Sequence, residues 1–342
     1  MKTLKYVFLC LFSVLVWAKE TPSWLEGFKI KGDFRVRGEF TDYDNDATKD
    51  RNRGRFRLRL GIEKKLNETV TFNLRLASGV GEATSTNQSF DGGFGEKDFW
   101  IDQAYLTYKK AGYELGAGKV KNPLETTDIL WDGDVNPEGL YQGFEFGKGF
   151  LNLTEFMVEE QSSKKDSNLL AIQGGFKPSK ALTVAVGYHY YTNLDTAGLA
   201  LEGNTGFAED FHIADFLLIW KGKAGEKSIS ATVHYLNNLD ENAPEGISAE
   251  DTGYGFFFDY GSAKNPGEWS LGYKYAHIEA NSVVGAFADS DFGFADKEGH
   301  VLKFAYASHK WMTWKASLFL VDGILKETTD FTRLQLDCEV KF

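Results

Sequence analysis

Apolar and polar residues alternate along much of the chain, most regularly over residues 28–40. In that segment every second position is apolar or glycine, and the positions between them are charged: Lys29, Lys31, Asp33, Arg35, Arg37 and Glu39. A β-strand places successive side chains on opposite faces, so the pattern predicts a strand with one apolar face and one face in water. Residues 53–64 and 70–76 repeat the alternation.

Thirteen further segments continue the pattern less regularly, which makes about 16 predicted strands: 99–109, 112–121, 139–147, 150–160, 168–177, 181–192, 211–221, 227–237, 253–260, 268–279, 299–308, 312–321 and 330–342. Their connections alternate between short turns, such as 65–68 and 110–111, and long polar loops, such as 79–98, 121–138 and 280–298. Short periplasmic turns and long external loops are typical of transmembrane barrels, and a soluble sandwich has no reason to follow this rule. We therefore expect an all-β, antiparallel, up-and-down transmembrane barrel over residues 28–342.

The end of the chain and the aromatic residues fit this prediction. The last segment carries apolar residues on one parity and ends in Phe342, which is typical of outer-membrane barrels. Aromatic residues near the ends of predicted strands suit interfacial girdles, although core packing explains any one of them equally well: Trp100, Tyr108, Tyr113, Trp220, Tyr260, Trp269 and Trp311.

The first residues predict export. Lys2 and Lys5 precede an apolar stretch at residues 7–16, and Ala18 completes a small-residue exit, so residues 1–18 are read as a cleaved signal peptide. A membrane anchor would need roughly 18 or more apolar residues, and this run is shorter. Residues 19–27 are then a short periplasmic lead-in, and the destination is the bacterial outer membrane.

Charge and cysteine content narrow the possible partners. Loss of the signal peptide lowers the count of Lys and Arg from 38 to 36, against 49 Asp and Glu, so the mature net charge is −13. Such an acidic chain argues against nucleic acid as a partner. Only Cys338 remains in the mature chain, which therefore forms no internal disulfide.

Several stretches resemble the putative porin family of Gram-negative outer-membrane β-barrels. They are residues 32–39 (GDFRVRGE), the arginine-alternating run 51–60, residues 101–106 (IDQAYL), residues 118–123 (GKVKNP) and, most specifically, residues 130–139 (LWDGDVNPEG). The likeness concentrates in residues 24–147. It implies a passive channel for small hydrophilic solutes that contacts outer-membrane lipid and lipopolysaccharide and carries no cofactor. Porins of this size are often trimers, but the sequence identifies no trimer contact.

Basic residues gather on one face of the first three predicted strands. An arginine that faced lipid would cost roughly 2–4 kcal/mol near the midplane. We therefore expect a basic wall that lines the lumen: Arg35, Arg37, Arg53, Arg55, Arg57, Arg59 and Arg75. Such a wall could attract anions. Alternatively, the bases pair with acids of neighbouring strands, and Asp337 and Glu339 could neutralise Lys29 and Lys31 where the last strand meets the first.

Residues 122–138 form the third external loop by position, and in porins this loop commonly folds inward and narrows the channel. Its acidic residues could then face the basic wall across a constriction: Glu125, Asp128, Asp132, Asp134 and Glu138. The alternative is a solvated surface loop, because turn-forming pairs such as Asp132-Gly133 and Asn136-Pro137 are frequent in it.

Other signals are weak. Residues 42–53 imitate the start of a calcium loop but carry Ala47 and Arg53 where such a loop needs Gly and Glu, and the six histidines are scattered, so we expect no metal site. No hydrolase or nucleotide motif appears, and we expect no enzyme, although a pair such as Ser230 and His234 could assemble across strands. A structural or adhesive barrel with a closed lumen remains the main alternative.

Overall fold

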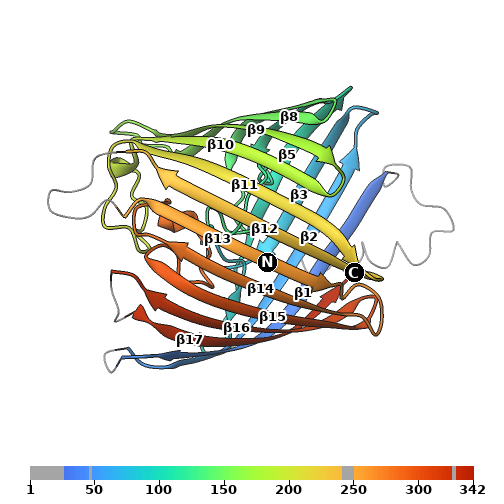
Figure 1. Ribbon diagram of the computed structural model, residues 1–342, viewed down its shortest axis with the longest axis vertical. Coiled ribbons are helices and arrows are strands. Elements are labelled where there is room, and N and C mark those ends of the chain that lie inside the picture. Colours follow the sequence, from blue (N-terminus) through green and yellow to red (C-terminus); the bar gives the residue numbers. More distant parts are fainter. Residues whose placement is uncertain (1–26, 46–47, 241–249, 326–328) are drawn as a thin grey trace, which may run out of the picture.

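Sixteen long strands form one closed antiparallel sheet in the computed structural model, which describes residues 27–45, 48–240, 250–325 and 329–342 (Figure 1). The predicted signal peptide at 1–18 and most of the lead-in at 19–27 lie outside the described residues. The strands are β1 (Phe28–Tyr43), β2 (Arg51–Lys65), β3 (Val70–Ser78), β5 (Phe99–Lys110), β6 (Tyr113–Lys119), β7 (Glu138–Phe146), β8 (Gly149–Glu159), β9 (Ser167–Ser179), β10 (Leu182–Thr192), β11 (Phe211–Ala224), β12 (Lys227–Asn238), β13 (Thr252–Gly261), β14 (Trp269–Ile278), β15 (Lys297–His309), β16 (Met312–Gly323) and β17 (Phe331–Lys341).

Each long strand pairs with the next along the chain, and β17 pairs with β1 to close the barrel. Closure removes the two free edges that an open sheet would expose, which is the condition for a sheet to cross a bilayer. The predicted fold class is thus confirmed. Three short elements among the described residues were not predicted. The two-residue strand β4 (Gln88–Ser89) in the loop after β3 pairs with Arg55 and Phe56 of β2. The other two are the 3-10 helices η2 (Leu194–Thr196) and η3 (Gly285–Phe287), each in a long loop.

The apolar face of the alternation points outward. On β1, Phe34, Val36 and Phe40 are 38%, 39% and 47% exposed, whereas Arg37 and Glu39 between them are 5% and 0% exposed. The outer surface thus carries a continuous band of exposed apolar side chains, which only lipid can cover favourably. None of the helices among the described residues is long and apolar enough to cross a membrane.

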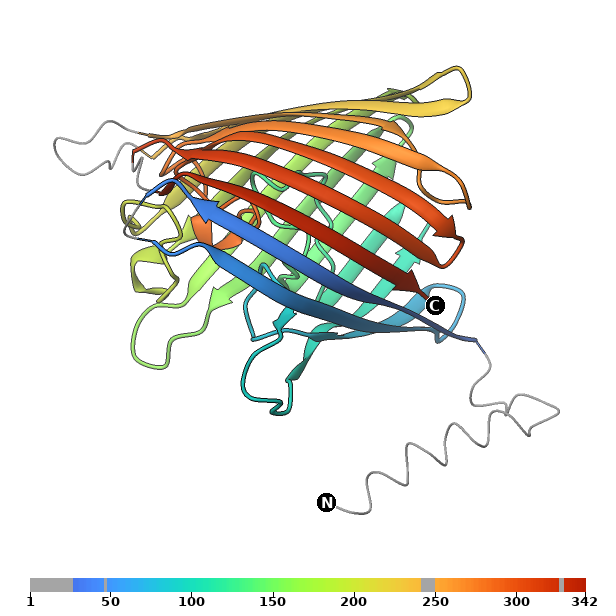
Figure 2. The same cartoon turned by 90° about the horizontal axis from the view of Figure 1, so that it is seen from below.

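The connections alternate in length as predicted. Turns of two to seven residues join β2 to β3, β5 to β6, β7 to β8, β9 to β10, β11 to β12, β13 to β14 and β15 to β16. The C-terminus lies at the end of the barrel that carries these turns (Figures 1 and 2). Following the porin pattern, we call this the periplasmic end and the opposite end the external end.

Long loops from the external end enter the lumen and build an apolar core inside it. Residues 120–137, 193–210 and 279–296 contribute buried side chains such as Trp131, Leu194 and Phe292, which pack with inward-facing residues of the wall such as Tyr191 and Ile213. Figure 2 shows the inner chain segments within the barrel. The lumen is therefore partly filled near its external end.

Two details of the sequence analysis are wrong. The register places Asp337 opposite Arg37 and Glu339 opposite Arg35, so these acids do not neutralise Lys29 and Lys31. Trp100 does not belong to an outer girdle, because its indole nitrogen donates to the carbonyl of Gly79 at 2.8 Å and its ring lines an internal cavity.

Arginine on the outer face of β10 should destabilise the barrel, whereas arginine on its inner face should not. Val186 is 57% exposed on the outer face near the middle of β10, and its neighbour Ala185 points inward. We expect Val186→Arg to lower the free energy of unfolding by about 2–4 kcal/mol, because the guanidinium enters the hydrocarbon. Urea unfolding in vesicles, followed by heat-dependent gel mobility, measures the change.

The matched control is Thr183→Arg, three residues earlier on the opposite parity of the same strand. The side chain at position 183 faces the lumen, so the free energy of unfolding of this variant should stay close to that of the unmodified chain. Equal losses in the two variants would contradict the assignment of the faces.

Candidate functional site

Carboxylates contact all seven arginines of the predicted basic wall on the lumen side of β1, β2 and β3. Arg57 and Arg59 both contact Asp33, at 2.7 and 2.9 Å. Arg37 bonds Asp337 of β17 at 2.7 Å and Asp291 of an external loop at 3.0 Å. The remaining pairs are Arg35 with Asp337, Arg53 and Arg55 with Glu39, and Arg75 with Asp102. The wall is therefore a network of ion pairs.

Four of the seven arginines are almost inaccessible to water. Arg35, Arg37, Arg55 and Arg57 are 5–9% exposed, because external loops lie over them. Within residues 84–89, Asn87 accepts a hydrogen bond from Arg35 at 2.6 Å, and Ser85 lies 3.4 Å from Arg55. These four guanidinium groups therefore contact carboxylates and loop atoms more than water. The side chains of Arg53, Arg59 and Arg75 keep 19–23% exposure.

The segment 120–137, called the inner loop below, is bonded to lumen-facing side chains of several strands. The backbone of Glu125 exchanges two hydrogen bonds with the side chain of Gln173 on β9. Thr127 lies 2.7 Å from His234 on β12, and the indole of Trp131 donates to the hydroxyl of Tyr191 on β10 at 2.9 Å. These contacts hold the inner loop against the part of the wall from β9 to β12.

The acidic residues predicted as one constriction set have separate partners. Asp134 bonds Arg59 at 3.3 Å, and it alone among them contacts the basic wall within the described residues. The others pair elsewhere: Glu125 with Lys177 of β9 at 3.0 Å, Asp128 with Lys274 of β14 at 2.8 Å, and Glu138 with Lys119 of β6 at 2.8 Å. The inner loop is thus tied to opposite sides of the lumen.

A second loop, residues 279–296, supplies groups that sequence reasoning missed. Lys274 is 2% exposed and bonds both Asp128 of the inner loop and Asp289 of this second loop. Asp291 bonds Arg37, and its carbonyl oxygen accepts from Arg333 at 2.6 Å. The sequence shows a single lysine, Lys274, among the residues of β14, but it does not show which loops contact this lysine.

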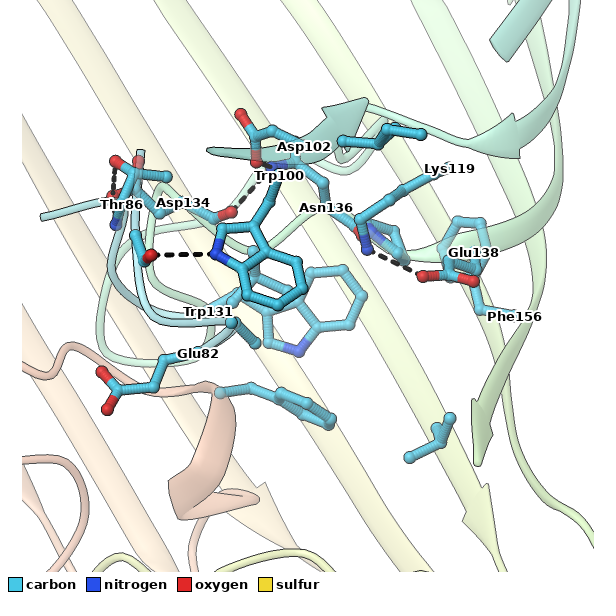
Figure 3. A pocket seen from close by; sticks show the side chains of 18 of the residues that line it. Glu82, Thr86, Trp100, Asp102, Lys119, Trp131, Asp134, Asn136, Glu138 and Phe156 are labelled. Atoms are coloured by element: carbon cyan, nitrogen blue, oxygen red, sulfur yellow. Dashed lines mark hydrogen bonds and ion pairs between the residues drawn. The ribbon is translucent and has the colours of Figure 1, made fainter. Parts of the chain in front are cut away.

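Two cavities lie on opposite sides of the inner loop. The external one is about 880 Å³ and includes Trp100, Trp131 and Asp134 in its lining (Figure 3). The periplasmic one is about 500 Å³ and includes Tyr105, Glu114 and Lys121.

Between the cavities the inner loop is bonded directly to the barrel wall. The amide of Asn136 donates to Asp102 at 2.8 Å and is hydrogen-bonded to the amide of Gln103 at 2.7 Å. Asp102 is also held by Arg75. Asn136, Asp102 and Gln103 thus form a bridge between the inner loop and the barrel wall.

The serine and the histidine of the hydrolase hypothesis do not pair with each other. Ser230 donates to Asp259, whereas His234 contacts Asp215 and Thr127, so the serine and histidine of the hydrolase hypothesis have separate partners. No group of three or more potential metal ligands occurs in the described part of the chain.

The ionisation of Asp132 in the inner loop is strongly perturbed. Burial and the nearby carboxylate of Asp289 raise the pKa of Asp132 to about 8. Its backbone nitrogen donates to the carbonyl of Phe287 at 2.7 Å, which places it where the two loops meet. The two loops therefore pack together best while this carboxyl is protonated.

Docking of the inner loop should weaken as the pH rises. In an undocked loop Asp132 ionises near pH 4, and in the docked loop only near pH 8. The stability that this group contributes is therefore complete below about pH 4 and is lost as the pH approaches 8. We expect hydrogen-exchange protection of residues 128–135, corrected for the intrinsic rate, to fall between pH 5 and 8.

Asp132→Asn keeps the shape of the protonated acid and should abolish this pH dependence. Glu138→Gln is the control, because Glu138 is 64% exposed and bonded to Lys119. If hydrogen-exchange protection in Asp132→Asn still fell between pH 5 and 8, the pH dependence could not be assigned to the carboxyl of Asp132.

Comparison with known proteins assigns the chain to a family. The model of the family described as "Putative porin" matches residues 42–200 and 204–342. Solved structures include a variant of the Rh. blastica porin, with 12% identity, 92% of this chain and 100% of that chain covered, and a TM-score of 0.57. A second is Pseudomonas putida OprB, with 12% identity, coverage of 92% and 94%, and a TM-score of 0.63.

At such low identity the structural likeness shows the fold alone, and no curated protein matches the chain. The family match covers most of the chain and agrees with the closed barrel of 16 long strands and its apolar outer face. Family and fold together point to the bacterial outer membrane and to a channel without catalytic function. The chain belongs to the putative porin family.

Proposed function

We propose that the protein is a passive diffusion channel of the outer membrane for small hydrophilic solutes. The observation that carries this proposal is a barrel with an apolar outside and a charged lumen that holds cavities on both sides of an inward loop. Residues 1–18 direct its export as a cleaved signal peptide, and its outer surface contacts lipid and lipopolysaccharide. Assembly as a homotrimer accords with the family.

The channel prefers anions, but only modestly. The seven wall arginines contact seven carboxylates: Asp33, Glu39, Asp102, Asp134, Asp291, Asp337 and Glu339. The excess of positive charge comes from two further bases: Arg333, which donates to the backbone carbonyl of Asp291, and Lys315, which pairs with Glu339. Arg59 and Arg75 are the wall arginines most open to water, so we assign the preference chiefly to them.

The inner loop acts as the constriction. Its Asp134 is bonded to Arg59, and Asn136 is bonded to Asp102 beside Arg75, so the loop meets the wall at the two most exposed arginines. Positive and negative groups then face each other across the narrowest passage. A charged solute experiences a transverse field there.

A structural barrel with a closed lumen is the second candidate, and the bridge of Asn136, Asp102 and Gln103 favours it. If the bridge stays closed, solutes cannot pass between the two cavities on that side. Liposome swelling separates the candidates: entry of small sugars or anions supports a channel, and an unchanged vesicle volume supports a closed barrel.

Neutralising the two exposed arginines should shift ion selectivity. We expect Arg59→Gln with Arg75→Gln to lower the anion-to-cation permeability ratio by about twofold or more, because Asp33, Asp102 and Asp134 lose cationic partners. Reversal potentials in a planar bilayer under a salt gradient give the ratio. Lys29→Gln is the control, since Lys29 pairs with Glu63 near the periplasmic end. An unchanged ratio in the double variant would rule out a role for these arginines.

Removal of residues 125–136 should raise single-channel conductance, because it deletes the loop that separates the two cavities. The effect is measured in the same bilayer recordings at symmetric salt. A deletion of residues 162–165 at the external rim serves as control and should leave conductance nearly unchanged. A loop deletion with ordinary conductance would mean that the inner loop does not limit the current.

A further inference from the structure

The external cavity contains a large aromatic side chain that neither the fold nor the channel explains. Trp100 is 46% exposed although its side chain points into the lumen (Figure 3). Its indole nitrogen is bonded to the carbonyl of Gly79, and its six-membered ring lies against Gly81. The ring is thus fixed in place with part of its surface in water.

Other aromatic side chains support the lining of the same cavity, but three of them, Trp131, Phe156 and Tyr191, are only 0–4% exposed. Trp131, Phe156, Tyr191 and Phe287 also belong to its lining. They form a connected cluster: the ring centroids of Trp131 lie 6.4 Å from Phe156 and 6.3 Å from Phe287, and Trp131 donates to Tyr191. These packed rings form a rigid aromatic floor, and Trp100 offers an exposed face to a ligand without further rearrangement.

The charges of the lining decide between ligand classes. Its acids are Glu82, Asp102, Asp134, Glu138, Glu159 and Glu160, and Lys119 is the one base among the described lining residues. Asp102, Asp134 and Glu138 have cationic partners. Glu82, Glu159 and Glu160 form no ion pair within the described residues, which leaves the cavity with an excess of three negative charges.

We propose that this cavity binds small organic cations, with an ammonium or guanidinium group held between the face of Trp100 and the free carboxylates, Glu82 foremost. Cations are attracted to the faces of aromatic rings, most strongly to tryptophan, and the surplus of carboxylates adds to this attraction. Figure 3 shows Glu82 and Trp100 on the lining of this one cavity. An anion would be repelled, and a neutral solute would gain only the aromatic contact.

The proposed cation site differs from the basic wall in its position and in the sign of its charge. The wall acts on ions that pass the inner loop, whereas this cavity lies before the loop on the external side. The proposal rests on the proposed channel only for its effect on current. Binding itself requires nothing more than the folded barrel.

Three probes of similar size test the charge requirement: 2-phenylethylammonium, 2-phenylethanol and 3-phenylpropionate. Titration calorimetry of the full barrel in detergent should give the tightest binding for the ammonium. Glu82→Gln should weaken it about threefold or more and Trp100→Leu about tenfold, as loss of a cation–π contact implies. The alcohol should bind Glu82→Gln and the unmodified protein equally.

Trp220→Leu is the matched control, because Trp220 is similarly exposed, at 43%, but on the outer surface of β11. Heat-dependent gel mobility verifies that each variant remains a barrel. Equal affinity for all three probes would replace the proposal with a neutral aromatic site, and tighter binding of the carboxylate would overturn it.

A block of the ion current by externally added ammonium probe tests the position of the site separately. Binding without block would place the site away from the conducting path and leave the cation site standing. A protein that conducts without binding the ammonium would refute the cation site and leave the channel standing.

Discussion

The pairing of buried arginines with carboxylates is the constraint on which the rest of the structure depends. Closure of the barrel brings β17 against β1, so Arg37 meets Asp337 while its neighbour Arg35 lies opposite Glu339. A charge removed from water without a partner costs several kcal/mol. Each inward arginine therefore requires an acid, and where the wall supplies too few, the external loops supply the remainder through Asp134 and Asp291.

This requirement explains why the loops enter the lumen. Asp291 and Asp134 belong to two different loops, and Lys274 on β14 bonds both of these loops. The ion pairs are joined by an apolar core around Trp131 and Phe292. Hydrophobic burial provides most of the stabilisation. The charges select the position in which each loop docks, because a misplaced loop would leave Lys274 or Arg37 unpaired.

The sequence predicts the strands of the barrel well, but it does not predict how the loops pack inside the lumen. Strand alternation is a local, periodic signal imposed by lipid on one face and water on the other, so all 16 long strands and the orientation of the arginines follow from it. The residues that dock a loop inside the lumen follow no periodic pattern along the chain. Nothing in the order of residues shows that Lys274 reaches Asp289, and the bulge between Arg75 and Leu76, which precedes the inward turn of Trp100, is equally hidden.

Extensive pairing also divides the lumen into electrically different zones. Around β1 and β2 the charges nearly cancel, so solutes there experience alternating groups more than a net field. The external cavity retains unpaired acids because its aromatic floor offers them no bases. Net charge and ligand preference are therefore local properties of this barrel. A chain that is acidic overall can hold a nearly neutral stretch of lumen behind a cavity rich in carboxylates, because ion pairs are set by local contacts and not by overall composition.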